Sequence, residues 1–235
     1  MPDMATRMKN YETAFAHTLM PRTPVIVRVD GRAFHSLPLA KPFDAAFGNA
    51  MVLAAGDLAK EMQGFRLGYT QSDEASFLLL DTDTFDTEPW FANDQAKIVS
   101  LAAAIMSVAF SRYWDALDYS GGIPVFDSRA FNVPADDLAN YFLWRAKDCE
   151  RNSVAMLAQA NFSHKQLYKK GRADMHEMLH EKGINWATDV APRFRNGVFI
   201  LRDGTTTGEV LPTYAGVNTL VGAATRPGAA VDTGE

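Results

Sequence analysis

The sequence has very little cysteine, because Cys149 is the only one among its 235 residues. A single thiol excludes an intramolecular disulfide framework and a zinc site built from several thiolates, and it suits a reducing cytoplasm. Long hydrophobic runs are also missing, since the longest, residues 98–110, is too short to span a bilayer and contains two serines. The first 15 residues lack the apolar core of a signal peptide. We therefore expect a soluble, cytoplasmic protein with no membrane partner.

Positive charge is scarce over most of the chain, whose net charge is −5 at pH 7. An acidic balance of this kind argues mildly against a nucleic-acid partner. The charge is unevenly spread, however, because residues 141–205 carry 11 basic and 7 acidic side chains, a net charge of +4. A surface that binds a phosphate backbone is therefore expected in this part of the chain.

Apolar periodicity predicts the order strand, helix, hairpin, helix, strand. This order is typical of an α+β fold with a palm-type (ferredoxin-like) layer, a mixed, mainly antiparallel sheet with helices on one face. The predicted elements are helices at 8–19, 44–62, 95–117, 136–160 and 164–182, and strands at 25–29, 65–70, 75–80, 125–133 and 198–201. We divide the chain into a catalytic palm domain (1–135), a C-terminal helical region that contacts RNA (136–204) and a loose tail rich in Gly, Thr and Ala (205–235).

Two aspartates stand beside predicted strands that one helix separates in the sequence. Asp30 ends the first strand, and Asp73 lies at the turn of the hairpin, so both carboxylates are expected at one end of a sheet. Two carboxylates held close together repel each other unless a divalent cation lies between them. Each aspartate alone is more typical of a turn, but the pair indicates Mg²⁺-dependent nucleotidyl transfer. Arg28, Arg32 and Lys41 are close enough in sequence to neutralise triphosphate oxygens.

A competing motif lies near the C-terminus. His176, Glu177 and His180 match H-E-x-x-H, which places two histidines on one helix face as a zinc peptidase requires. The longer form of the motif needs a third histidine where this chain has Trp186, and the other possible ligand, Glu209, falls in the predicted tail. An ordinary amphipathic helix is the favoured interpretation.

Lys165, Lys169 and Arg172 follow helical spacing and would form one basic stripe. A solvated helix face is the simpler interpretation of this stripe, and a ridge that contacts RNA phosphates is the alternative.

Five motifs run through most of the chain in a fixed order: RVDGRAFH at 28–35, KPFD at 41–44, YTQSDE at 69–74, FDSR at 126–129 and WRAKD at 144–148. Together they resemble the tRNA-His guanylyltransferase family over about residues 8–200, and most closely its bacterial and archaeal guanylyltransferase-like branch. The resemblance implies a homotetrameric 3′-to-5′ polymerase acting at the 5′ end of tRNA. In such enzymes ATP or GTP activates the RNA 5′-monophosphate, and the 3′-hydroxyl of an incoming nucleotide then attacks it.

The resemblance also assigns roles to individual residues. Asp30 and Asp73 would be catalytic and, with the Gly31 carbonyl, would hold two Mg²⁺ ions. Nucleotide binding would involve Arg28, Asp30, Gly31, Arg32, Ala33, Phe34, His35, Lys41, Asp44, Ser72, Asp73 and Lys97. Separately from the resemblance, we expect Arg145, Arg151, Asn152, Lys165, Lys169 and Arg172, in the basic part of the chain, to bind RNA.

The chain departs from the family at three places. Residues 150–153 read ERNS, a form that favours the branch associated with templated repair of truncated tRNA 5′ ends. Phe43 replaces an asparagine, and the loop at 81–94 is acidic where relatives are often basic. A cyclase or another palm nucleotidyltransferase that uses NTP alone remains an alternative, as does a catalytically silent RNA-binding relative.

Overall fold

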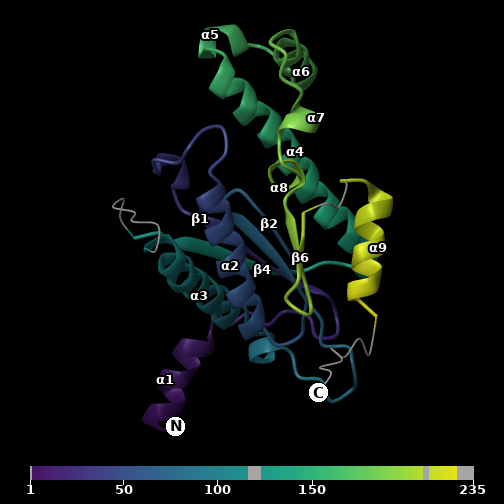
Figure 1. The fold of residues 1–235 in the computed structure, drawn as a ribbon. Coiled ribbons are helices and arrows are strands. Elements are labelled where there is room, and N and C mark those ends of the chain that lie inside the picture. The colour runs from purple at the N-terminus through teal and green to yellow at the C-terminus, as the bar shows by residue number, and fades with distance from the viewer. Residues whose placement is uncertain (1, 116–122, 209–211, 227–235) are drawn as a thin grey trace.

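A single antiparallel sheet organises the computed structural model, which describes residues 2–115, 123–208 and 212–226. Within these residues the strand order is β4–β1–β3–β2–β5–β6, and every pairing is antiparallel (Figure 1). The strands are β1 (Val25–Gly31), β2 (Phe65–Gln71), β3 (Glu74–Leu79), β4 (Phe126–Asn132), β5 (Val198–Leu201) and β6 (Thr206–Thr207).

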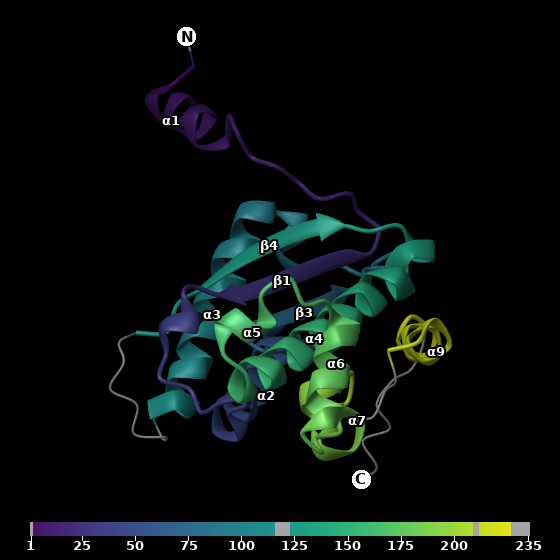
Figure 2. The same cartoon turned by 90° about the horizontal axis from the view of Figure 1, so that it is seen from above.

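Helices fill the connections and extend beyond the sheet. The α-helices are α1 (Met4–Thr13), α2 (Ala45–Glu61), α3 (Gln95–Asp115), α4 (Leu138–Asn161), α5 (His164–Leu167), α6 (Arg172–Glu181), α7 (Trp186–Asp189), α8 (Pro192–Asn196) and α9 (Tyr214–Ala224). Short 3₁₀ helices lie at Phe34–Ser36 (η1), Trp90–Asn93 (η2) and Ala135–Asp137 (η3). Helix α1 buries none of its residues and projects away from the body (Figure 2).

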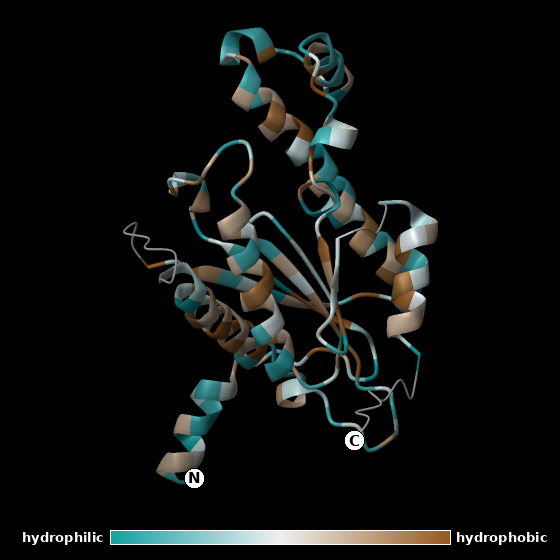
Figure 3. Cartoon of the chain, viewed as in Figure 1, coloured by the Kyte–Doolittle hydropathy of each residue, from teal (hydrophilic) through white to brown (hydrophobic). Residues whose placement is uncertain are grey.

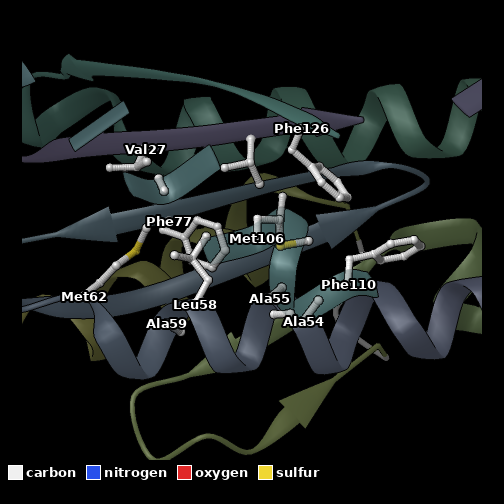
Figure 4. Packing of buried hydrophobic residues seen from close by; sticks show 14 of the residues in the cluster. Val27, Ala54, Ala55, Leu58, Ala59, Met62, Phe77, Met106, Phe110 and Phe126 are labelled. Carbon is white, nitrogen blue, oxygen red and sulfur yellow. The ribbon is translucent and has the colours of Figure 1, made fainter. Parts of the chain in front are cut away.

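One face of the sheet packs against α2 and α3. Val27 and Phe77 point from the strands toward Leu58, Met106 and Phe110 on the two helices, and all five side chains are almost fully buried (Figure 4). Burying an aliphatic or aromatic side chain of this size stabilises the fold by about 1.5–3 kcal/mol. This layer therefore anchors the central strands that carry the acidic residues.

The opposite face is covered as well, which corrects the prediction of helices on one face only. Ile26 and Leu78 point to this side and pack with α4 and α9, where Val217 and Val221 are buried. The physical reason is visible in β1, which is apolar at consecutive positions from Val25 to Val27 and so must be covered on both sides.

Two boundaries drawn from the sequence are also wrong. Strand β5 joins the same sheet beside β2, so the limit at residue 135 cuts through one folded unit. The predicted loose tail contains β6 and the packed helix α9, whereas residues 209–211 and 227–235 lie outside the described residues. The predicted helix at 164–182 is divided into α5 and α6, because the chain takes a left-handed conformation at Lys169 (φ +59°).

Helix α3 is long and apolar enough to cross a membrane by length and composition, so the length argument made from residues 98–110 is wrong. In this structure Ile98, Ala102, Met106 and Phe110 are buried against the sheet and α2. Figure 3 shows the apolar residues gathered along this helix. The core helix of a soluble protein can have the same length and apolar composition.

Candidate active site

The end of β1 lies beside the turn that joins β2 and β3. Asp30 is paired with Glu74 in the antiparallel register, and the Gly31 N–H donates a hydrogen bond to the Asp73 carbonyl at 2.8 Å. Ser72 has a φ of +49°, which reverses the chain within a two-residue turn. The fold therefore brings Asp30 and Asp73 to one end of the sheet, as the sequence predicted.

The electrostatics of this end are those of crowded carboxylates. Burial raises the pKa of Asp73, and the negative charge of Asp30 raises it further, although hydrogen bonds and Arg28 act in the opposite direction. Burial also raises the pKa of Glu74, against the lowering effect of two arginines. A divalent cation would relieve the repulsion between Asp30 and Asp73.

The donor atoms at this end fit Mg²⁺. Two carboxylates and the Gly31 carbonyl offer hard oxygen ligands, and Mg²⁺ in proteins is commonly held by one or two carboxylates together with substrate phosphates. Among the described residues no three His, Cys, Asp or Glu side chains form a group able to hold a metal ion. A cation bound here would therefore take its remaining ligands from a phosphorylated substrate or from water.

Arg28 and Arg145 belong to a buried charge network behind the two aspartates. Arg28 Nη2 lies 2.6 Å from both an Asp30 oxygen and a Glu74 oxygen. Arg145 is 4% exposed and pairs with Glu74 and Asp148. Arg145 is therefore held inside the protein, so its contact with RNA stays a prediction, and Arg28 is turned toward carboxylates rather than toward a triphosphate site.

The loop after β1 carries the predicted triphosphate contacts. Ala33 takes a left-handed conformation (φ +59°), and the chain then forms the single 3₁₀ turn η1. The N–H groups that open a helix have no partner within it, so those of Phe34 and His35 are available to an anion. The N–H of Arg32 instead donates to the Val125 carbonyl at 2.8 Å, so this amide is already occupied.

A cavity of about 410 Å³ opens beside this loop, within the usual size range of ligand pockets. His35, Lys41, Asp44, Ser72 and Asp73 all line it. Its apolar walls comprise Phe34, Leu37, Leu39, Phe43, Phe47, Met51, Val52, Met156, Phe194 and Val198. A cavity that is apolar within and polar at one end suits a nucleotide, whose base is flat and whose phosphates are charged.

Asp44 fixes one wall of the cavity at the start of α2. Its side chain accepts hydrogen bonds from the Phe47 N–H at 2.9 Å and the Ala40 N–H at 3.0 Å. Asp44 is therefore the N-cap of α2, and the same carboxylate also holds the loop that leads into the helix.

Helices α4 and α8 supply residues that the sequence interpretation missed. Arg193 donates to the Asn49 side chain at 2.6 Å, and Phe194 stacks on Phe43 with ring centroids 4.9 Å apart. Asn152, predicted as an RNA contact, lines the cavity. Residues from α8 join the site only through tertiary contacts, so no local signal in the sequence could have identified them.

Lys97 lies away from the cavity, and its role in nucleotide binding stays a prediction. The Phe126 N–H donates to Ser107 on α3, and Phe126 is paired with Gly31, so Ser107 is level with the acidic end of the sheet. Lys97 precedes Ser107 by ten residues, about 15 Å along the helix axis, toward the opposite end.

The remaining basic candidates are on the surface. Arg151, Lys165 and Lys169 are exposed, and Arg172 pairs with Glu150 at 3.4 Å. Because α5 and α6 are separate helices, these side chains do not form one helical stripe. Their contact with RNA stays a prediction.

The H-E-x-x-H segment lies on α6. His176 packs edge-on against Trp186, with ring centroids 5.5 Å apart, and His180 is exposed. Trp186 occupies the position where the longer motif needs a histidine, and Glu209 lies outside the described residues. No zinc-binding group of three such side chains is found in the part of the chain that the structure describes.

Comparison with known proteins identifies the family. The family model for tRNAHis guanylyltransferase matches residues 5–134. The tRNA(His) guanylyltransferase of Schizosaccharomyces pombe is 30% identical over 76% of this chain and 73% of its own length. That of Neurospora crassa is 28% identical over 79% of this chain and 69% of its own length.

Solved structures agree with the sequence matches. A bacterial tRNA(His) guanylyltransferase-like protein in complex with ATP is 35% identical, with a TM-score of 0.91 over 95% of this chain and 100% of that one. A bacterial protein of the same description in complex with GTP is 30% identical, with a TM-score of 0.81 over the same shares. On this evidence, the chain belongs to the tRNA(His) guanylyltransferase family of nucleotidyltransferases.

Proposed function

We propose that this chain adds nucleotides to the 5′ end of a tRNA in the 3′-to-5′ direction, with ATP or GTP as the activating nucleotide. The observation that carries the proposal is the cavity that ends at Asp73, beside Asp30 and the loop of η1. Family membership and similarity to proteins described in complex with ATP and with GTP support it.

Different residues of the cavity bind different parts of the substrates. The apolar walls receive a nucleobase, while Lys41 neutralises phosphate charge and the amides of Phe34 and His35 donate hydrogen bonds to phosphate oxygens. Asp30 and Asp73 provide the negative charge that attracts divalent cations. Two Mg²⁺ ions held by Asp30, Asp73 and the Gly31 carbonyl would supply charge neutralisation at phosphorus and acidify the attacking hydroxyl.

The sequence ERNS at 150–153 suggests the finer activity. Asn152 and Ser153 line the cavity, so this segment, in which Ser153 departs from relatives, reaches the proposed nucleotide site. We propose that the chain repairs truncated tRNA 5′ ends by templated addition, with addition of a single guanylate to tRNA-His as the related activity.

Assembly and location are part of the proposal. Met4, Met8, Tyr11 and Phe15 follow helical spacing in and just after α1, and each is between 46% and 87% exposed. An apolar stripe of this kind supports association with further copies of the chain, and we propose a homotetramer. A cytoplasmic location without a membrane partner is consistent with the single buried cysteine.

The test uses two RNA substrates. Purified protein is incubated with Mg²⁺, ATP, GTP and either mature tRNA-His or tRNA-His that lacks its first 5′ nucleotide, and the added residues are sequenced. Templated repair predicts restoration of the missing nucleotide and little addition to mature tRNA. Asp30→Ala and Asp73→Ala should abolish addition without unfolding the chain, and near wild-type addition by either variant would show that the metal site is misplaced.

A cyclase that uses NTP alone is the second candidate, because the cavity by itself does not require RNA. Labelled GTP supplied with and without 5′-monophosphorylated tRNA separates the two. Turnover without RNA would favour the cyclase, and strict dependence on RNA would exclude it.

A further inference from the structure

Glu74 lies at the centre of a partly buried ion-pair network. It is 5% exposed and is paired with Asp30 in the strand register. Its carboxylate accepts from Arg28 at 2.6 Å and from Arg145 at 3.1 and 2.9 Å. Both oxygens of one carboxylate are therefore used to hold two guanidinium groups.

Arg145 reaches this network from α4, which packs on the face of the sheet that carries Ser76 and Glu74. Its guanidinium also lies 3.2 Å from an oxygen of Asp148 and 3.7 Å from the centre of the Trp144 ring. Two carboxylates and an aromatic face fix its position, and its own burial leaves it little room to move. Arg145 is therefore a rigid support rather than a mobile surface cation.

The contacts form one continuous path. Arg145 holds Glu74, Glu74 holds Arg28, and Arg28 holds the Asp30 carboxylate at 2.6 Å. Every link is a charge-assisted hydrogen bond, the strongest kind available to side chains. The last link ends on one of the two aspartates assigned to the metal.

Stability alone does not explain such a network. Removing charges from water is costly, and a buried ion pair is often no more stable than well-packed apolar residues of similar size. The network does fix geometry, because each planar guanidinium accepts only a narrow range of carboxylate positions. Fixed carboxylate positions matter most at a site where a carboxylate must bind a ligand accurately.

We propose that Arg145 is a positioning residue of the active site, which holds Asp30 in its cation-binding orientation through Glu74 and Arg28. The inference rests on the proposed function for the identity of the site. It gives Arg145 a role inside the protein, apart from the predicted contact with RNA. Without Arg145, Arg28 is the one remaining partner that the described residues provide for the Glu74 carboxylate, and Arg28 is then drawn away from Asp30.

Binding of Mn²⁺, a paramagnetic substitute for Mg²⁺, tests the proposal without any catalytic step. Mn²⁺ is titrated into the full chain without nucleotide or RNA, and free Mn²⁺ is measured by electron paramagnetic resonance. Arg145→Met should raise the apparent dissociation constant about tenfold. Arg145→Lys should raise it about threefold, because lysine keeps the charge but not the two-pronged contact. Binding within twofold of wild type in folded Arg145→Met, or no Mn²⁺ binding by the wild-type chain, would overturn the proposal.

Arg66→Met is a matched control. Arg66 is also almost fully buried and paired with a carboxylate, Asp83, but it lies at the opposite end of β2 from the acidic turn. The Arg66→Met variant should lose stability as Arg145→Met does, but it should bind Mn²⁺ with wild-type affinity. Equal weakening in both variants would mean that the effect comes from general loosening of the fold, which refutes the inference.

A double variant separates positioning from charge balance. Arg145→Met combined with Glu74→Gln removes both members of the pair and leaves no buried carboxylate without its partner. The proposal predicts recovered stability with Mn²⁺ binding still impaired, whereas recovery of both would show that Arg145 only neutralises Glu74. Nucleotide addition to tRNA is assayed separately, so a wild-type chain that binds Mn²⁺ but adds no nucleotide would refute the proposed function and leave this inference standing.

Discussion

Replacing Gly31 by alanine tests whether the end of β1 must approach the loop of η1 as closely as the structure shows. A Cβ at this position would lie 2.7 Å from two carbons of the Phe34 ring. That ring is 3% exposed, and its centroid lies 6.0, 5.6 and 4.9 Å from those of Phe47, Phe110 and Phe126. Because three aromatic rings pack around this ring, much of the strain must be relieved in the backbone at Gly31 itself.

The size of the effect follows from these distances. Ordinary contacts of a Cβ begin near 3.4 Å, so the chain must shift by about 0.7 Å. Overpacking of this kind costs about 1–3 kcal/mol of stability. A misplacement of about 1 Å in a catalytic group can reduce the rate about a hundredfold. We therefore expect Gly31→Ala to lower kcat/KM for nucleotide addition by roughly 10- to 100-fold.

The assay combines urea unfolding with the rate of GTP addition to truncated tRNA-His. Gly56→Ala is the control, since a Cβ there meets nothing within 4 Å and alanine favours a helix by about 0.5–1 kcal/mol. Combining Gly31→Ala with Phe34→Leu makes room for the new methyl group and should recover part of both losses. A Gly31→Ala variant with wild-type stability and rate would refute the reasoning.

Three further predictions concern the same region. Burial raises the pKa of Asp73 above its ordinary value, so the folded chain without metal favours the protonated carboxyl. The stability that this protonated Asp73 contributes is lost as pH rises through the raised pKa. Asp73→Asn should therefore resist urea better than wild type, by a margin that is larger at pH 7 than at pH 4, and an equal margin would contradict the shift. Tyr69→Phe removes the hydrogen bond at 2.9 Å to the Asn196 carbonyl and should cost about 1–3 kcal/mol in urea unfolding, because that buried oxygen loses its partner. Asp44→Ala should cost about 1 kcal/mol as a lost N-cap and should also weaken GTP binding in calorimetry, whereas an unchanged affinity would separate the cap from the cavity.

Local features of the sequence predicted most elements of this fold. Apolar periodicity predicted a helix at 44–62, close to the observed α2, since this signal depends on residues within a few turns. Asp30 and Asp73 were placed together because each adjoins a strand of the same sheet. The break between α5 and α6 was not foreseen, because helical spacing of Lys165, Lys169 and Arg172 says nothing of backbone conformation at Lys169.

The sequence by itself determined the kinds of elements, their order and the family motifs, since these depend on neighbouring residues. Only the tertiary structure decided how distant segments share the site. It placed Phe194 of α8 against Phe43 and buried Arg145 beneath Glu74, although a positive charge in a basic region suggested an exposed RNA contact. The physical reason is that burial and ion pairing depend on which faces of helix and sheet meet, and local periodicity leaves that choice open.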